Sequence, residues 1–193
     1  NDAVTTILTV DRGIPSVNLV TNPSIESSTI SMYTASGSAI SQSSDQAATG
    51  SNSLLVNPAN SAAGEGFYWA SGSIVGQVNP NPSFLVATCE VRGASASGDA
   101  ELVIQDSSGT DLVASTSISL STAFQAMNVK YRLPDQGDAT YRIMVRSKTQ
   151  HNINFDVDKI HVEQRIGDSN IPDYVDGAQG LNYEWTGTAN AST

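Results

Sequence analysis

Short runs of β-prone residues, separated by polar turns at regular intervals, dominate the chain from residue 51 onward. The turns at residues 106–109 and 134–137 contain the glycine, proline and aspartate that tight turns favour. Many short strands at even spacing are typical of a sandwich or a jelly roll. We therefore expect an all-β fold, an antiparallel β-sandwich of jelly-roll type with little helix. The runs are Ser53 to Asn57, Gly66 to Ala70, Phe84 to Val91, Ala100 to Asp106, Leu112 to Leu120, Phe124 to Leu133, Thr140 to Arg146 and Ile153 to Gln164.

The turn at residues 107–109 carries the signal of a hairpin. Leu102 and Ile104 alternate on one side of the preceding run, and Leu112 resumes the pattern after the turn. Because a strand exposes alternate residues on opposite faces, this parity predicts two antiparallel strands that share a buried face.

The last run changes parity halfway along. Phe155 and Val157 share one face of a regular strand, whereas Ile160 and Val162 fall on the other face. One extra residue inserted near positions 158–159 would return the second pair to the core. We therefore expect a β-bulge at Asp158 and Lys159.

Composition narrows the classes of function. The 193 residues suit one sizeable domain with appendages, and only 15% of them are charged. The formal net charge of −10 repels phosphate backbones, so no nucleic-acid partner is expected. No apolar stretch approaches the roughly 20 residues that span a bilayer, so no membrane insertion is expected either. The single cysteine, Cys89, lies in an apolar run and is predicted to be a buried, inert thiol.

Both ends of the chain lie outside the expected sandwich. We divide the chain into an N-terminal arm (residues 1–16), a jelly-roll domain (17–165) and a C-terminal extension (166–193). The β-prone and aromatic residues of the two arms would gain hydrogen bonds and apolar burial by adding to another chain's sheet edge. The residues that we expect to contact other subunits are Val4, Ile7, Leu8, Val10, Tyr174, Tyr183 and Trp185.

The C-terminal extension holds a short recognisable pattern. Residues 174–177 read Tyr-Val-Asp-Gly, and residues 185–188 read Trp-Thr-Gly-Thr before a run of small polar residues. This string resembles a terminal signature of bacteriophage virion proteins, especially tail and minor structural proteins, with Val175 in place of the usual second aromatic residue. The resemblance implies a non-enzymatic structural or decoration protein on the surface of a capsid or tail. Its partners would be other virion subunits.

A second resemblance covers residues 17–164. The segment Asn18 to Glu26 is similar to the opening of carbohydrate-binding-module-like jelly rolls, residues 50–56 resemble their Gly-x-x-Ser-Leu strand, and residues 156–160 resemble their closing Asp-Asp-Val strand. The three motifs are short, and they occur in the order that those modules show. The resemblance implies the same jelly-roll fold and raises the possibility of a glycan partner.

That resemblance also implies a structural calcium ion. The side chains that match the ligands of such modules are Glu26 and Asp158, with backbone carbonyls completing the oxygen shell. Hard oxygen ligands suit Ca²⁺, and the expected bulge would turn Asp158 away from a regular ladder. The alternative is that both residues are solvated carboxylates at strand ends.

Sugar binding requires an exposed aromatic platform. Tyr68 and Trp69 are the best candidates, because adjacent residues of a strand point to opposite faces and at least one of the two would be exposed. The alternative is core packing, which is the commoner fate of a tryptophan in a strand.

Catalytic motifs are weak. His151 and His161 bracket the last run without the neighbours of a nucleophile elbow or a metal motif. The carboxylate pairs Asp99 with Glu101 and Asp156 with Asp158 each share a strand face, as solvated pairs often do. We therefore expect a virion structural protein that is not an enzyme. The alternative is a carbohydrate-binding module that attaches to cell-surface or environmental glycans, and a glycoside hydrolase is a distant third.

Overall fold

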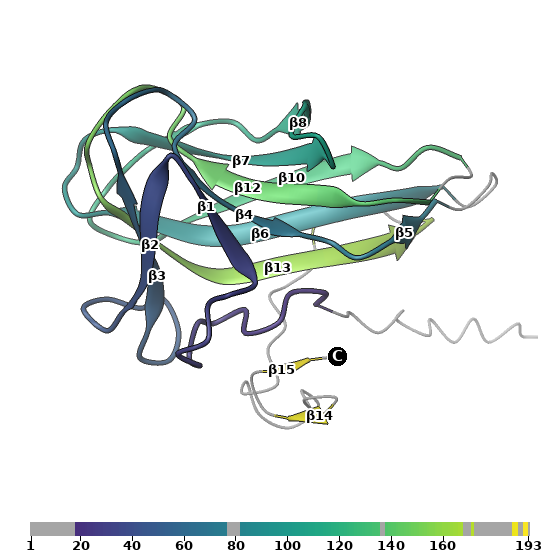
Figure 1. Cartoon of the computed structure of the whole chain (residues 1–193), viewed down its shortest axis with the longest axis horizontal. Coiled ribbons are helices and arrows are strands. Elements are labelled where there is room, and N and C mark those ends of the chain that lie inside the picture. The colour runs from purple at the N-terminus through teal and green to yellow at the C-terminus, as the bar shows by residue number, and fades with distance from the viewer. Residues whose placement is uncertain are drawn as a thin grey trace, which may run out of the picture.

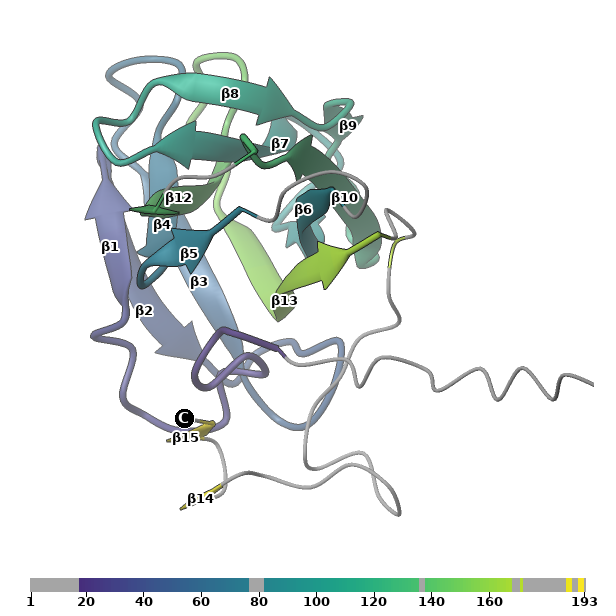
Figure 2. The same cartoon turned by 90° about the vertical axis from the view of Figure 1, so that its right-hand side faces the viewer.

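The computed structural model describes residues 18–76, 82–135, 138–167, 171, 187–188 and 191–192, and these residues include strands and no helix. Two antiparallel sheets pack face to face (Figures 1 and 2). The six-stranded sheet has the order β1-β4-β12-β7-β8, and β9 also pairs with β7. Its strands are β1 (Tyr33–Ser36), β4 (Gly66–Ala70), β12 (Tyr141–Arg146), β7 (Asp99–Asp106), β8 (Asp111–Ala114) and β9 (Ile118–Ser119).

The five-stranded sheet forms the second layer, in the order β10-β6-β13-β3-β2. Two further pairs are small: β5 (Ile74–Val75) with β11 (Asp138–Ala139), and β14 (Gly187–Thr188) with β15 (Ala191–Ser192). The predicted antiparallel β-sandwich is confirmed. The strands of the five-stranded sheet are β10 (Gln125–Arg132), β6 (Ser83–Gly93), β13 (Phe155–Ile166), β3 (Ser53–Pro58) and β2 (Ser38–Ser43).

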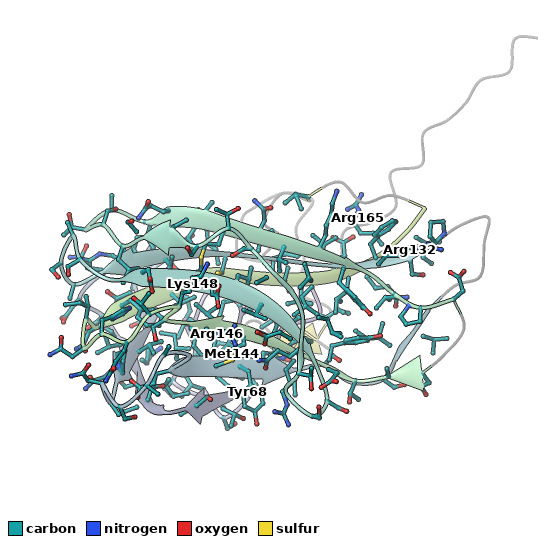
Figure 3. All side chains as sticks on the ribbon, turned by 90° about the horizontal axis from the view of Figure 1, so that it is seen from above. Tyr68, Arg132, Met144, Arg146, Lys148 and Arg165 are labelled. Carbon is teal, nitrogen blue, oxygen red and sulfur yellow. The ribbon has the colours of Figure 1, made fainter. Side chains whose placement is uncertain are left out.

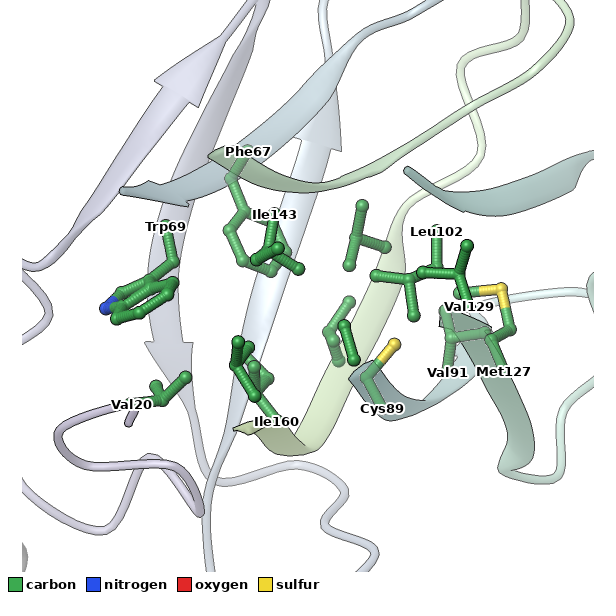
Figure 4. Packing of buried hydrophobic residues seen from close by; sticks show 14 of the residues in the cluster. Val20, Phe67, Trp69, Cys89, Val91, Leu102, Met127, Val129, Ile143 and Ile160 are labelled. Atoms are coloured by element: carbon green, nitrogen blue, oxygen red, sulfur yellow. The ribbon is translucent and has the colours of Figure 1, made fainter. Parts of the chain in front are cut away.

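The core lies between the two sheets and takes alternate residues from the long strands of both, such as β6, β7 and β12 (Figure 4). In β4, Phe67 and Trp69 both face inward, and the Phe67 ring meets Tyr33 of β1 edge-on at 5.5 Å. Cys89 is buried in the same core, as predicted, and its burial raises the pKa of the thiol. The chain therefore has one continuous apolar centre that both sheets share.

The bulge predicted in the last run is confirmed. The pairing of β13 with β6 shifts register between Asp158 and His161, and Lys159 takes a left-handed conformation with φ of 51°. Beyond the shift, Ile160 and Val162 return to the core. Asp158 precedes the shift and still pairs with Glu90 of β6, so it follows Asp156 on the outer side of the sheet, where it is fully buried just past the last residue that pairs with β3.

The hairpin at residues 107–109 is also confirmed, because β7 and β8 pair antiparallel across it. The Asp106 carboxylate accepts the N–H groups of Ser108 and Thr110 at 2.8 and 2.9 Å, and Gly109 has φ of 93°. The predicted run from Leu112 to Leu120 divides into β8 and β9. It divides at Ser115, whose backbone N–H and hydroxyl both bond to Leu102 of the adjacent strand.

The opening segment is tied to β13 by side-chain hydrogen bonds of Asn18 and by two isolated backbone bonds, from Leu19 N–H to the Val162 carbonyl and from Ile160 N–H to the Pro23 carbonyl. The Asn18 side-chain amide donates to the carbonyl of Ile160 at 2.9 Å and accepts the N–H of Val162 at 3.0 Å. Val20 and Ile25, further along the segment, are both fully buried. The described part of the chain contains no helix with the length and apolar character needed to cross a membrane.

Candidate functional site

The outer face of the six-stranded sheet carries an aromatic residue among charged ones. The residues that alternate with the core positions point to this face, and Figure 3 shows Tyr68, Met144 and Arg146 grouped there. The strand register places Tyr68 beside Met144, Arg142 beside Gln105, and Arg146 beside Glu101. We call this set the sheet face; it consists of Tyr68, Glu101, Val103, Gln105, Asp111, Arg142, Met144 and Arg146.

Tyr68 and Trp69, the two aromatic candidates, point in opposite directions. Trp69 is 7% exposed and packs in the core, so its burial excludes it as an open platform for sugar. Tyr68 is half-buried on the sheet face. Phe67 and Trp69 share parity, and placing both large apolar side chains inside leaves Tyr68 outside.

An arginine covers the ring of Tyr68. The guanidinium carbon of Arg142, on the neighbouring strand β12, lies 4.8 Å from the ring centroid in a cation–π contact. The same guanidinium lies against the β7–β8 turn. If Gly109 carried a Cβ atom, that atom would lie only 2.9 Å from Nη1 of Arg142. Glycine at this position therefore leaves room for the arginine.

Arg146 forms the centre of an ion-pair network that the sequence did not predict. It donates from Nε to Glu101 at 2.8 Å and from Nη2 to Asp111 at 2.7 Å, and the Gln105 amide also donates to Asp111, at 2.8 Å. The hydrogen bond from Arg146 holds the pKa of the Asp111 carboxyl below its ordinary value, although partial burial opposes the shift. The network therefore stays charged and fixed at neutral pH.

Glu26 and Asp158 hold one loop from its two ends. Asp158 Oδ2 accepts the N–H groups of Ala48 and Thr49 at 2.8 and 2.9 Å. Glu26 Oε1 accepts those of Ser51 and Asn52 at 2.8 and 2.9 Å. We call this arrangement the carboxylate clamp. It brings the two predicted calcium ligands to the same loop, although they lie far apart in sequence.

The pKa of Asp158 is raised to about 6. Burial is the main cause and the nearby Glu26 carboxylate adds to it, while three backbone N–H bonds act in the opposite direction. A cation beside the clamp would offset this excess of negative charge. Asp158 Oδ1 accepts the N–H of Lys159 and Glu26 Oε2 accepts the Asn52 side-chain amide, and a carboxylate oxygen with one such bond retains acceptor capacity for a metal.

The chemistry of this donor set fits calcium, with the two carboxylates as ligands. Such an ion would supply positive charge and would join the opening segment to the bulge of β13. Among the residues that the structure describes, no group of three or more His, Cys, Asp or Glu side chains is arranged for a metal. Further ligands from the described residues would be neutral oxygens such as backbone carbonyls, and the calcium site stays a prediction.

The remaining titratable candidates make structural contacts. Asp99 accepts the N–H groups of Lys148 and Thr149, both at 2.9 Å, while its neighbour Glu101 binds Arg146. Asp156 pairs with Arg92 at 3.2 Å. The side-chain roles at these positions therefore differ from those of a paired general acid and base.

The histidines are engaged as well. His161 is fully buried and lies 3.2 Å from the Glu163 carboxylate, and the His151 ring lies 2.8 Å from the carbonyl oxygen of Asp99.

A shallow pocket of about 240 Å³ opens at the end of β10, where Tyr131, Arg132 and Asp135 are among its lining residues.

The residues predicted for subunit assembly lie outside the described parts of the chain, so the structure gives no account of them. They are Val4, Ile7, Leu8, Val10, Tyr174, Tyr183 and Trp185.

Comparison with known proteins identifies the fold through structure alone. No family model matches the chain, and no curated protein matches it by sequence. The CBM22-1 xylan-binding domain from Paenibacillus barcinonensis matches with a TM-score of 0.57 at 16% identity, over 80% of this chain and 97% of that domain. A C-terminal family 22 carbohydrate-binding module of Clostridium thermocellum matches with a TM-score of 0.52 at 20% identity, over 81% of this chain and all of that module (100%).

An arabinose-bound α-L-arabinofuranosidase also matches, with a TM-score of 0.59 at 16% identity. The match covers 76% of this chain but only 26% of that enzyme. The Paenibacillus domain and the Clostridium module, both matched along almost their whole length, are carbohydrate-binding modules. The fold is a jelly-roll β-sandwich of the kind that carbohydrate-binding modules have.

Proposed function

We propose that this chain is a carbohydrate-binding module and that the sheet face holds the glycan. The observation that carries the proposal is the half-buried Tyr68 ring, set on a face whose polar groups are fixed by the Arg146 network. Apolar C–H faces of a sugar stack on aromatic rings, while hydroxyl groups need donors and acceptors at defined positions. The sheet face supplies both.

The rigidity of the network favours binding. Arg146 is held by two carboxylates, so ordering it on contact with a ligand costs little conformational entropy. Met144 and Val103 are buried beneath these side chains and support them from below. A glycan on this face would contact the members that reach the surface, Tyr68, Arg142, Arg146 and Asp111.

The names of the matched proteins suggest the first ligands to test. The Paenibacillus domain is described as xylan-binding, and a xylan-type polysaccharide is therefore our proposed ligand class for this chain. No catalytic step is proposed, because the carboxylates of the sheet face are engaged by Arg146.

Retention in affinity gels that contain soluble xylan tests the proposal. Tyr68→Ala should weaken retention by about two- to tenfold, the value of one aromatic contact, whereas Tyr68→Phe keeps the ring and should bind almost as wild type does. Tyr131→Ala provides a control, because Tyr131 lines the separate pocket at the end of β10. If Tyr131→Ala abolishes retention and Tyr68→Ala does not, the glycan lies in that pocket and our assignment of the site is wrong.

A virion role remains a second prediction. It depends on the pattern of residues 174–188, and the structural comparisons add no support for it. The two functions are compatible, because a subunit on a particle surface can also bind sugar.

A further inference from the structure

Arg142 has no carboxylate partner among the described residues, whereas Arg146 on the same strand binds both Glu101 and Asp111. The guanidinium makes neither an ion pair nor a hydrogen bond with the described residues, and its contact is with the Tyr68 ring at 4.8 Å. By contrast, a carboxylate oxygen lies within 3.2 Å of each of Arg92, Arg132, Arg146, Lys159 and Arg165.

The carboxylates nearest to Arg142 along the sheet are already engaged. Gln105, its neighbour on β7, donates to Asp111, and Asp111 is bound by Arg146. Asp106 directs its carboxylate to the N–H groups of its own turn, and the Ser108 hydroxyl bond, followed by those N–H bonds, keeps the pKa of Asp106 low. No acid in this row is therefore left to neutralise Arg142.

A guanidinium over an aromatic ring is suited to an anionic ligand. Its N–H groups lie in its own plane and present a fork that matches the two oxygens of a carboxylate. On the sheet face, this fork lies over the Tyr68 ring, so a sugar that reaches the uncovered part of the ring would also lie next to the guanidinium. A carboxylate attached to that sugar would meet Arg142 while the sugar contacts Tyr68.

We propose that Arg142 makes the sheet face selective for glycans that carry carboxylate groups, namely uronic acids. The inference rests on the proposed function and adds the charge of the ligand to it. The net charge of −10 does not prevent such binding, because repulsion from distant acids is screened over about 8 Å at physiological salt, whereas the Arg142 contact is direct.

The test uses one polysaccharide in two forms, glucuronoxylan and the same polymer with its carboxyl groups reduced to alcohols. Isothermal titration at 0.15 M salt should show that the wild-type protein binds the acidic form about two- to fivefold more tightly, as expected of an exposed but well-oriented charge pair. Arg142→Gln should lose this preference and still bind the reduced polymer. Arg142→Lys, which keeps the charge without the fork, should retain part of it.

Controls separate this inference from the proposed function. Arg132→Gln removes an exposed cation at another site and should keep the full preference. Equal wild-type affinity for both polymers would overturn the inference and leave glycan binding intact, whereas binding to neither would overturn both. If Arg142→Gln lost affinity for both polymers equally, Arg142 would be a contact of the glycan that does not depend on its carboxylate groups. Equal binding of dextran sulfate would reduce the effect to unselective charge attraction, which would also overturn the inference.

Discussion

Replacing Asp158 by asparagine should change how the stability of the protein depends on pH. The folded-state pKa of Asp158 is about 6, against an ordinary value of 3.8. At 1.36 kcal/mol for each pKa unit, ionising Asp158 costs about 3 kcal/mol more in the folded state than in the unfolded state. Because the folded pKa is the higher of the two, the folded protein takes up this proton first as pH falls. The contribution of Asp158 to stability is therefore absent above pH 7 and grows as pH falls through 6 toward 4.

Urea unfolding at pH 7, 6 and 5, in the presence of a chelator, measures this effect. Between pH 7 and pH 5, the unfolding free energy of the wild-type protein should rise relative to that of Asp158→Asn by about 1 kcal/mol. Taking the difference between the two proteins removes the contribution of every other acid. Asp45→Asn, at an exposed position of the same loop, is the matched control and should follow the wild type.

A constant separation between the wild-type and Asp158→Asn free energies from pH 7 to pH 5 would refute the reasoning. It would mean that the carboxyl group of Asp158 does not titrate in this range and that the clamp is less shielded from water than the structure implies.

Three further predictions concern the ion, the core and the arms. Calcium should raise the melting temperature of the wild-type protein by mass action, and Glu26→Gln should reduce that response while Glu65→Gln should not; an identical response in all three would reject the site. Trp69→Ala should cost about 3–5 kcal/mol of stability in urea unfolding, whereas Tyr68→Ala should cost much less; similar losses would contradict their opposite orientations. Deleting residues 1–12 or 174–193 should leave a soluble, folded sandwich that fails to join particles in a reconstitution assay, and normal incorporation of both would exclude the assembly role.

Local patterns predicted the strands whose two faces differ. The run from Gly66 to Ala70 has the bounds of β4, and the parity change at Val157 and Ile160 located the bulge. These features depend on neighbouring residues alone, since the two faces of a strand alternate along the chain. The polar stretch from Ser27 to Gly50 gave a weaker signal. It contains β1 and β2, which are edge strands whose exposed faces need few apolar residues.

The sheet face was predicted only through Tyr68. The contact of Arg146 with Glu101 and Asp111 requires β12 to lie beside β7, and the residues in contact are 45 and 35 positions apart. The residues near a strand do not specify which other strand it pairs with, because several strands of similar length could form the same pairing. The inward orientation of Trp69 did have a local signal, its shared parity with Phe67, which would have assigned the outer face to Tyr68 alone.

The carboxylate clamp binds its loop through backbone N–H groups, and this determines how the loop could be redesigned. Asp158 and Glu26 contact the main chain at Ala48, Thr49, Ser51 and Asn52, and only Asn52 adds a side-chain bond, so the tether does not depend on the side chains of the first three. Proline is the exception, because it lacks the donor. Gly50 must also be kept, since its φ is 66° and a Cβ there would collide with Glu26. A combinatorial library that keeps Asn52 and varies Ala48, Thr49 and Ser51 without proline would therefore present new chemistry at this end of the sandwich while the sheet beneath keeps its shape.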